Sequence, residues 1–474
     1  RAAEQKQLEA QLNLGIMYKY GRGVEENYTQ AIYWFNKPAE QGYAEAQTNL
    51  GWMYEYGKGV AQDYTEAIAW YQRAAEQNDT TAQLNLAVMY KYGKGVTKDD
   101  TQVFYWYKKA AERGDTVAQL NLGIMFQYGK GVDQDYSQAV QWYKKAAEQG
   151  QAEAQTSLGW MYENGKGIEE DDAEAIFWYK KAAEQGDTKA QLKLGIIYKN
   201  GNGIDEDYTQ SFYWYKKVAE QGDAIAQLNV GTMYEFGKGT IQDYTQAVHW
   251  YKKAAEQGQA EAQTSLGWFY ENGKGTDKDY TQAISWYKKA AEQGDTKAKL
   301  NLAIIYKNGK VAAEDYSQAF YWYKKVADQG DADAQLNLGL MYEYGKGTEE
   351  DYTQAVRWYR KAAEQGDTIA QLNLAVMYKY GTGVNEDFSQ AVLWYKKAAE
   401  QGDTKAQLNL AVMYASGEGV PENFVLAYKW ANLAAARGSE KAIELKSGVK
   451  KLMTREQIAE AQQLSLEWEN QSGK

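Results

Sequence analysis

Twelve tryptophans recur at a fixed spacing of 36 residues, and this period constrains the fold of the 474-residue chain more than any other feature. A period of roughly 20–50 residues is typical of solenoids, propellers and other repeat arrays. We therefore expect one elongated array of units, although about 150 residues per domain would suggest three globular domains. The twelve residues are Trp34, Trp70, Trp106, Trp142, Trp178, Trp214, Trp250, Trp286, Trp322, Trp358, Trp394 and Trp430.

Each unit is expected to contain two helices joined by a glycine-rich loop. In one copy, apolar residues between Ala190 and Tyr198 follow the i, i+4, i+7, i+8 spacing of a helical face. Asp187 stands where its carboxylate can accept bonds from the free N–H groups of the first turn. Gly201 stands where a left-handed residue commonly ends a helix, and a second helix should begin near Asp207. Strand patterns are absent, so the predicted fold class is all-α.

One position inside the first helix of each unit holds only glycine or alanine. A glycine in the middle of a helix costs roughly 1 kcal/mol relative to alanine. The restriction to small residues therefore predicts that a neighbouring helix approaches closely there. The position is occupied by Gly15, Gly51, Ala87, Gly123, Gly159, Gly195, Gly231, Gly267, Ala303, Gly339, Ala375 and Ala411.

The composition excludes several classes of function. The chain has 0 cysteines and 1 histidine, which excludes disulfides, thiolate metal sites and histidine metal clusters. A net charge of -11 argues against a nucleic-acid or anionic-membrane partner. No apolar stretch is long enough to span a membrane. Acidic loops such as residues 169–172 lack the ligand spacing of an EF-hand, so we expect no metal and no cofactor.

Catalytic motifs are weak. Ser285 with Lys288, and Ser447 with Lys450, match a Ser-x-x-Lys pattern that can activate a serine, but no companion motif follows either pair. His249 is the sole histidine and has no partner positioned by the sequence. We therefore predict that no residue is catalytic and that the protein is not an enzyme.

The repeated pattern Ala-x-x-x-Leu-Gly-x-x-Tyr-x-x-Gly-x-Gly-Val, then Ala-x-x-Trp-Tyr-x-Lys-Ala-Ala-Glu-Gln-Gly, resembles the Sel1-like repeat, a relative of the tetratricopeptide repeat. The resemblance covers essentially the whole chain and implies a right-handed superhelical solenoid of helix-turn-helix repeats. We expect twelve repeats over residues 1–438, beginning inside a preceding repeat. Residues 439–474 are expected to form a helical cap that covers the last apolar face.

In tetratricopeptide-like solenoids the first helices line the concave surface, so the resemblance places a binding surface there. One position on these helices is an asparagine in most repeats. Its amide could bind the backbone of a partner peptide, or it could bond neighbouring turns of the solenoid itself; both interpretations stay open. The asparagines are Asn13, Asn49, Asn85, Asn121, Asn229, Asn301, Asn337, Asn373 and Asn409.

Three further tryptophans lie in first helices, 108 residues apart: Trp52, Trp160 and Trp268. In each copy a threonine replaces the usual leucine four residues earlier, and a glutamate follows three residues later. Large aromatic side chains on an open surface are typical anchors of protein interfaces. Alternatively, duplication carried the tryptophans along as packing residues. The predicted protein-binding residues are Trp52, Trp160, Trp268, Asn49, Asn229, Asn301, Glu55, Glu163 and Glu271.

Alternating charge on the first helices favours a protein partner over a polyanion. The resemblance implies an adaptor that in bacteria often has an envelope or host-interaction role. It extends to secreted members that bind secretory IgA, and so implies a secreted or cell-surface monomer with an immunoglobulin partner. Two alternatives remain: a periplasmic or cytosolic scaffold for bacterial protein complexes, and an enzyme that binds or hydrolyses β-lactams. The missing cysteines and the isolated Ser-x-x-Lys pairs argue against the enzyme.

Overall fold

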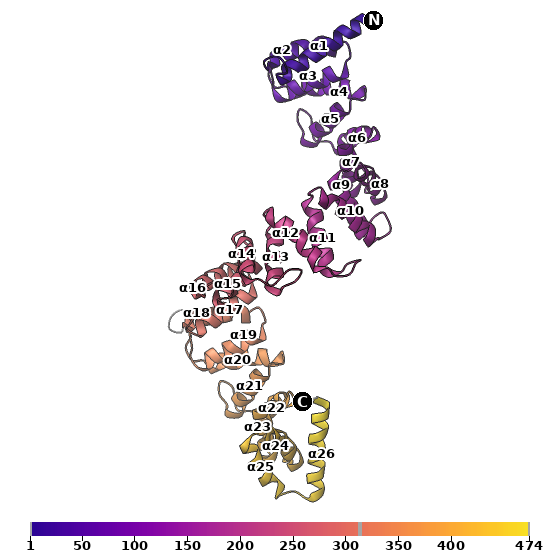
Figure 1. The fold of residues 1–474 in the computed structure, drawn as a ribbon. Helices are drawn as coiled ribbons and strands as arrows, with labels where there is room; N and C mark the ends of the chain where they lie inside the picture. Colours follow the sequence, from indigo (N-terminus) through magenta and orange to yellow (C-terminus); the bar gives the residue numbers. More distant parts are fainter. Residues whose placement is uncertain (1, 311–314, 473–474) are drawn as a thin grey trace. The chain divides into compact units, whose positions relative to one another are not determined.

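The computed structural model describes residues 2–310 and 315–472, which form 26 α-helices and no β-strand (Figure 1). The chain divides into two compact units, residues 1–242 and residues 243–474. The helices of the first unit are α1 (Ala2–Tyr20), α2 (Tyr28–Glu40), α3 (Ala44–Tyr56), α4 (Tyr64–Glu76), α5 (Thr80–Tyr92), α6 (Asp100–Glu112), α7 (Thr116–Tyr128), α8 (Tyr136–Glu148), α9 (Ala152–Glu163), α10 (Asp172–Glu184), α11 (Thr188–Asn200), α12 (Tyr208–Glu220) and α13 (Ala224–Phe236).

The second unit contains the remaining helices in the same alternation. They are α14 (Tyr244–Glu256), α15 (Ala260–Asn272), α16 (Tyr280–Glu292), α17 (Thr296–Lys307), α18 (Tyr316–Ala327), α19 (Ala332–Glu343), α20 (Tyr352–Glu364), α21 (Thr368–Tyr380), α22 (Phe388–Glu400), α23 (Thr404–Ser416), α24 (Phe424–Ala436), α25 (Glu440–Lys450) and α26 (Arg455–Ser472). Within each unit a helix packs mainly against the helices before and after it in the chain. The predicted all-α array of helix pairs is confirmed.

The ends of the helices are set by local chemistry. Asp187 accepts a hydrogen bond from the Ala190 N–H at 2.8 Å, and Asp207 accepts one from the Gln210 N–H at 3.0 Å. Gly201 ends α11 with φ of 70°, a left-handed conformation that favours glycine. These three predicted caps are confirmed, and similar caps recur along the chain.

The small residue inside each first helix is explained by an aromatic ring of the second helix. A Cβ atom on Gly51 would lie 2.6 Å from the Tyr71 ring, and one on Gly195 would lie 2.9 Å from the Tyr215 ring. Both distances are too short for a carbon contact, so the predicted close approach is confirmed. Tyr71 is fully buried between the two helices, and most of the twelve periodic tryptophans are buried as well.

A buried glutamine in most first helices joins one repeat to the next. The Gln155 amide donates to the Ala147 carbonyl at 3.0 Å and accepts from the Gln185 amide at 2.7 Å. A glutamine thus bonds the helix before it and a residue 30 positions further along. The same pair of bonds recurs at Gln47, Gln119, Gln191, Gln263, Gln335 and Gln371.

The last two helices pack against α24. The Trp468 ring of α26 meets the Trp430 ring of α24 at a centroid distance of 6.3 Å, and the Arg437 guanidinium lies 5.1 Å from Trp468. Val449 of α25 and Ala461 of α26 are buried in one cluster with Ala427. No helix in the described ranges is both long enough and apolar enough to cross a membrane.

Candidate functional site

The three tryptophans of the first helices lie at partly buried positions on α3, α9 and α15. Each indole packs against the buried cluster of at least one repeat, and Trp52 and Trp160 each contact two clusters. They are therefore neither free surface anchors nor fully enclosed packing residues. Their environments differ, and the difference decides which indole a partner could reach.

Trp52 is covered by neighbouring side chains. The Lys19 ammonium lies 4.2 Å from the centre of its ring, and the Tyr56 ring is 5.2 Å away. Lys19 also donates to the side-chain amide oxygen of Asn49 at 2.7 Å, which holds the lysine over the indole. Trp268 carries a cation as well, because the Lys274 ammonium lies 5.0 Å from its ring centre.

Trp160 lines an open groove of about 640 Å³, which we call the Trp160 groove. The groove lies across three successive first helices, α7, α9 and α11. Tyr128, Thr156, Lys189 and Ile196 are among the residues that line it. Among the described residues, no aromatic ring or cation is stacked on the Trp160 indole. The Trp160 groove therefore combines apolar surface with access from solvent.

Thr156 fills the threonine position that the sequence linked to the indole. Its hydroxyl donates to the Asp187 carboxylate at 3.0 Å, and Asp187 caps the next first helix. Thr48 and Asp79 form the same bond at 3.1 Å. These threonines join adjacent repeats, a role that the sequence did not indicate.

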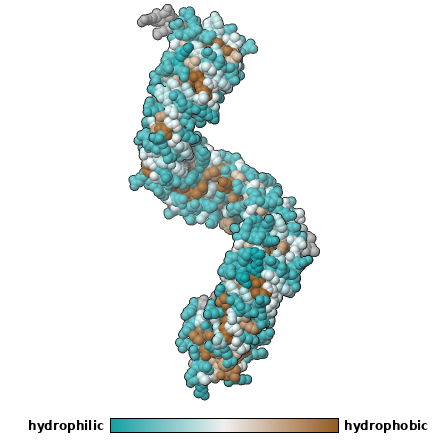
Figure 2. Space-filling model, turned by 180° about the vertical axis from the view of Figure 1, so that it is seen from behind, coloured by the Kyte–Doolittle hydropathy of each residue, from teal (hydrophilic) through white to brown (hydrophobic). Residues whose placement is uncertain are grey.

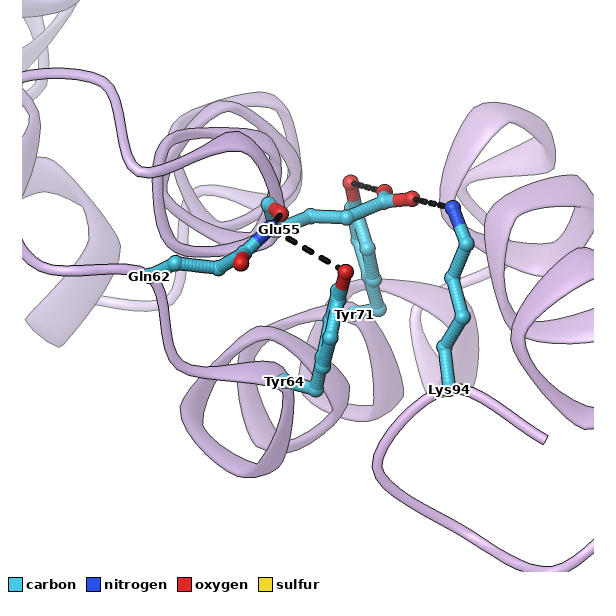
Figure 3. A network of polar contacts seen from close by, with 5 residues as sticks. All are labelled: Glu55, Gln62, Tyr64, Tyr71 and Lys94. Atoms are coloured by element: carbon cyan, nitrogen blue, oxygen red, sulfur yellow. Dashed lines mark hydrogen bonds and ion pairs between the residues drawn. The ribbon is translucent and has the colours of Figure 1, made fainter.

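Glu55 serves contacts within the chain (Figure 3). Its carboxylate accepts from the Tyr71 hydroxyl at 2.9 Å and from the Lys94 ammonium at 3.1 Å, and the residue is 4% exposed. Burial raises the pKa of Tyr71, and the neighbouring Glu55 charge raises it further. The hydrogen bond to Glu55 also raises the pKa of Lys94. Both oxygens of this predicted binding residue are thus engaged inside the protein.

Glu163 and Glu271 follow the same pattern. Glu163 accepts from the Tyr179 hydroxyl at 2.7 Å and pairs with the Lys193 ammonium at 2.9 Å. Glu271 accepts from the Tyr287 hydroxyl at 2.9 Å. Glu163 is the more exposed of the two paired glutamates, with 24% of its side chain accessible against 5% for Glu55.

The predicted asparagines also have partners inside the chain. The Asn49 and Asn229 amides donate to carbonyls one turn earlier in their own helices, at 2.8 and 2.9 Å. Lys199 donates to the Asn229 side chain at 3.1 Å, and the Asn301 side chain offsets part of the rise in the pKa of Tyr287. The interpretation in which asparagine serves the solenoid itself accounts for these bonds. Asn229 additionally lines a smaller hollow of about 280 Å³ on α11–α13.

A row of exposed aromatic side chains near the ends of first helices was not among the predicted protein-binding residues. Tyr20, Tyr56, Tyr92 and Tyr128 follow one another at the repeat period and are 52–62% exposed. The period itself could have revealed them. Figure 2 shows that hydrophobic patches interrupt the mainly hydrophilic surface of the face in view.

The serines and the histidine that were weighed as catalytic residues lie in ordinary helical positions. The Ser447 hydroxyl donates to the Ile443 carbonyl of its own helix at 2.9 Å, and Ser285 is exposed on α16. The His249 ring meets the Trp250 ring edge to face at 5.4 Å. No group of three or more histidine or acidic side chains that could hold a metal occurs in the described part of the chain.

Comparisons with known proteins agree with this geometry. The Sel1 repeat model matches twelve times without a gap, from residues 8–43 to residues 404–439. The chain is 40% identical to c5321, described as a protective antigen present in uropathogenic Escherichia coli strains displaying an SLR fold; the match covers 93% of this chain and 94% of that chain, with a TM-score of 0.74. It is 33% identical to a Sel1 repeat protein from Oxalobacter formigenes, over 65% of this chain and 90% of that chain, with a TM-score of 0.52. No curated protein matches. The chain belongs to the Sel1 repeat family.

Proposed function

We propose that this chain is a non-catalytic protein-binding solenoid that holds its partner on the first-helix surface of the repeats. Sel1 repeat solenoids are suited to protein–protein interaction. The observation that carries the proposal is the Trp160 groove, where a tryptophan at an open apolar hollow has no stacking partner among the described residues. Aromatic side chains in partly desolvated hollows supply a large share of the energy of protein interfaces.

We further propose a host-facing role, in which the protein is secreted or held at the cell surface and binds an immunoglobulin such as secretory IgA. The support is the likeness to c5321, described as a protective antigen of uropathogenic Escherichia coli. An antigen that protects is accessible to antibodies, which fits a protein outside the cell. The same surface could serve a periplasmic scaffold, and the experiment below separates the two.

The test measures binding of purified secretory IgA to the immobilised full chain by biolayer interferometry. Trp160→Ala should weaken binding at least tenfold, about 1.4 kcal/mol, because it removes the aromatic anchor. Tyr213→Ala is the matched control: Tyr213 is a 47% exposed aromatic side chain on a second helix, α12. Its removal should leave binding unchanged. Circular dichroism should show unaltered helicity in both variants.

Two results would contradict parts of the proposal. If Trp160→Ala and Tyr213→Ala bind secretory IgA equally well, the first-helix surface is not the interface. If secretory IgA does not bind but a bacterial envelope protein does, in a manner lost on Trp160→Ala, the scaffold replaces the host-facing role. Turnover of nitrocefin that Ser447→Ala abolishes would overturn the non-catalytic assignment.

A further inference from the structure

We infer that the Trp160 groove takes an acidic peptide segment that carries one aromatic or aliphatic side chain. This inference deepens the proposed function and rests on it, because it names the chemistry of the partner at that surface. Three observations carry it: the uncovered indole, the apolar wall beside it, and the exposed Lys189 ammonium that lines the groove without a carboxylate partner among the described residues.

The indole is uncovered because three residues differ from their counterparts around Trp52. The position of Lys19, which lies over Trp52, is Gln127 in the Trp160 groove, and the Gln127 side chain instead accepts a bond from the Tyr143 hydroxyl. Tyr56, which stacks on Trp52, corresponds to Asn164, whose amide donates to the Trp160 backbone carbonyl at 2.9 Å. The ring that Lys19 and Tyr56 would cover is therefore open.

The third difference makes room. Asn49, which anchors Lys19 beside Trp52, corresponds to the shorter Ser157 in the Trp160 groove. Across the groove, Leu192 and Ile196 of α11 supply apolar surface, and Ile196 is 41% exposed. A side chain from a partner could thus lie between the indole and Ile196. The groove volume of about 640 Å³ lies within the roughly 300–1,000 Å³ typical of ligand sites.

Two lysines line the groove although the chain as a whole carries -11, while the carboxylates of Asp187 and Glu163 bond the lining residues Thr156 and Tyr179. Lys189 and Lys193 line the groove, and no aspartate or glutamate does. Lys193 is paired with Glu163, while no carboxylate among the described residues pairs with the exposed Lys189. Lys166 adds charge nearby, with its ammonium 5.7 Å from the centre of the Tyr136 ring. Carboxylates of a partner would be attracted here, and a basic segment would be repelled.

The experiment measures fluorescence anisotropy of a fluorescein-labelled heptapeptide in which a central phenylalanine is flanked by aspartates and glutamates. The full chain should bind it saturably, and added salt should weaken binding because the contacts are partly ionic. Replacing the acidic residues of the peptide with lysines, or its phenylalanine with serine, should weaken binding at least tenfold.

Two protein variants locate the site. Lys189→Glu should weaken binding of the acidic peptide at least fivefold, and it changes an exposed residue, so the fold should be unaffected. Lys405→Glu is the matched control, since Lys405 is an exposed lysine at the same repeat position on α23. It should bind the peptide as the unaltered chain does. Trp160→Ala should abolish binding, with helicity as the check on folding.

The inference is overturned if the acidic peptide does not bind, if the three peptides bind alike, or if Lys189→Glu and Lys405→Glu have the same effect. None of these results removes the proposed function, which depends on whether a protein partner requires Trp160. If a protein partner requires Trp160 while the acidic peptide fails, the groove binds a different chemistry. If the protein partner ignores Trp160, the proposed function itself fails.

Discussion

One position near the end of the first helix holds glutamate in some repeats and lysine in others, and both side chains form hydrogen bonds inside the protein. Where that position is glutamate, as at Glu55, its carboxylate accepts from the buried tyrosine of its own repeat. Where it is lysine, as at Lys199, the ammonium donates to the asparagine of the next repeat. Both choices satisfy a polar group inside the array, within one repeat for Glu55 and between two repeats for Lys199, and leaving such a group unpaired costs about 1–3 kcal/mol. The alternation of charge therefore reflects contacts within the solenoid.

The tyrosine that Glu55 bonds can approach only because Gly51 has no side chain. Gly51→Ala should lower the free energy of unfolding by about 1–3 kcal/mol, since a Cβ atom would meet the Tyr71 ring at 2.6 Å. The gain in helix propensity, about 1 kcal/mol, acts in the opposite direction. Urea unfolding followed by circular dichroism, with hydrogen exchange over α3 and α4, measures the change.

Gly448→Ala is the control for Gly51→Ala. Gly448 lies inside α25, and a Cβ atom there would meet no atom within 4 Å. This substitution should stabilise the protein by up to about 1 kcal/mol through helix propensity alone. A Gly51→Ala protein as stable as the unaltered chain would show that displacing the Tyr71 ring costs no more than the roughly 1 kcal/mol gained in helix propensity.

Within the helices, the sequence predicts features that depend on nearby residues but not contacts between distant ones. Helix ends such as Asp187 and Gly201 depend on residues a few positions away, and they were predicted correctly. The partners of Glu55 were not, because Tyr71 lies 16 residues away and Lys94 lies 39 residues away, on other elements. A lone glutamate in a sequence is ordinarily read as solvated. The joint occurrence of Gly51, Glu55 and Tyr71 in one repeat was the available signal.

The candidate site shows the same division. The spacing of Trp160 marked it as exceptional, but it did not separate Trp160 from Trp52, whose neighbours within the first helix differ only at Asn49 and Tyr56, replaced by Ser157 and Asn164. Only the structure shows that Lys19 covers Trp52 while Gln127 turns away from Trp160. Whether an indole is open thus depends on side chains of the preceding repeat, 33 residues earlier in each case. A motif within a single repeat contains the change from Tyr56 to Asn164 but not the change from Lys19 to Gln127.

The buried glutamine that bonds helices of adjacent repeats allows a second prediction. Gln155→Met should lower the free energy of unfolding by about 1–3 kcal/mol, because it removes the bonds to the Ala147 carbonyl and the Gln185 amide. Gln83→Met is the matched control: Gln83 bonds the Ala75 carbonyl at 3.1 Å, but its own oxygen is buried without a partner among the described residues. Gln83→Met removes one hydrogen bond, but it also removes a buried oxygen that has no partner in the described part of the chain, and the second change is favourable.

Gln83→Met should therefore cost less than Gln155→Met, by about 1 kcal/mol. Hydrogen exchange of α8–α10 against α4–α6 measures each change locally, which suits an array whose repeats need not unfold together. Equal protection losses in the two variants would show that the bond between Gln155 and Gln185 contributes nothing to the joining of repeats.

For the whole chain, stability is expected to be the sum of similar repeats and of the contacts between neighbours. The same buried groups recur in both compact units, so a condition that affects one repeat affects many. The tyrosine of the second helix is such a group. Burial raises the pKa of Tyr215 and Tyr323 to about 12. Burial, together with a neighbouring glutamate, also raises the pKa of Tyr179 and Tyr287 well above the usual value.

This repetition predicts a steep loss of stability at alkaline pH. Because the folded pKa lies above the unfolded value near 10, the folded chain retains protons that the unfolded chain releases. The stabilisation is complete below pH 10 and is lost as the pH rises from there towards the folded values, at up to about 1.4 kcal/mol per pH unit for each tyrosine. The midpoint of thermal unfolding should fall above pH 10, together with the appearance of tyrosinate absorbance.

Tyr215→Phe, which removes a group whose pKa is raised by burial alone, should make the fall shallower while leaving stability near neutral pH almost unchanged. A fall that is just as steep in Tyr215→Phe as in the unaltered chain would show that the buried Tyr215 phenol does not cause it.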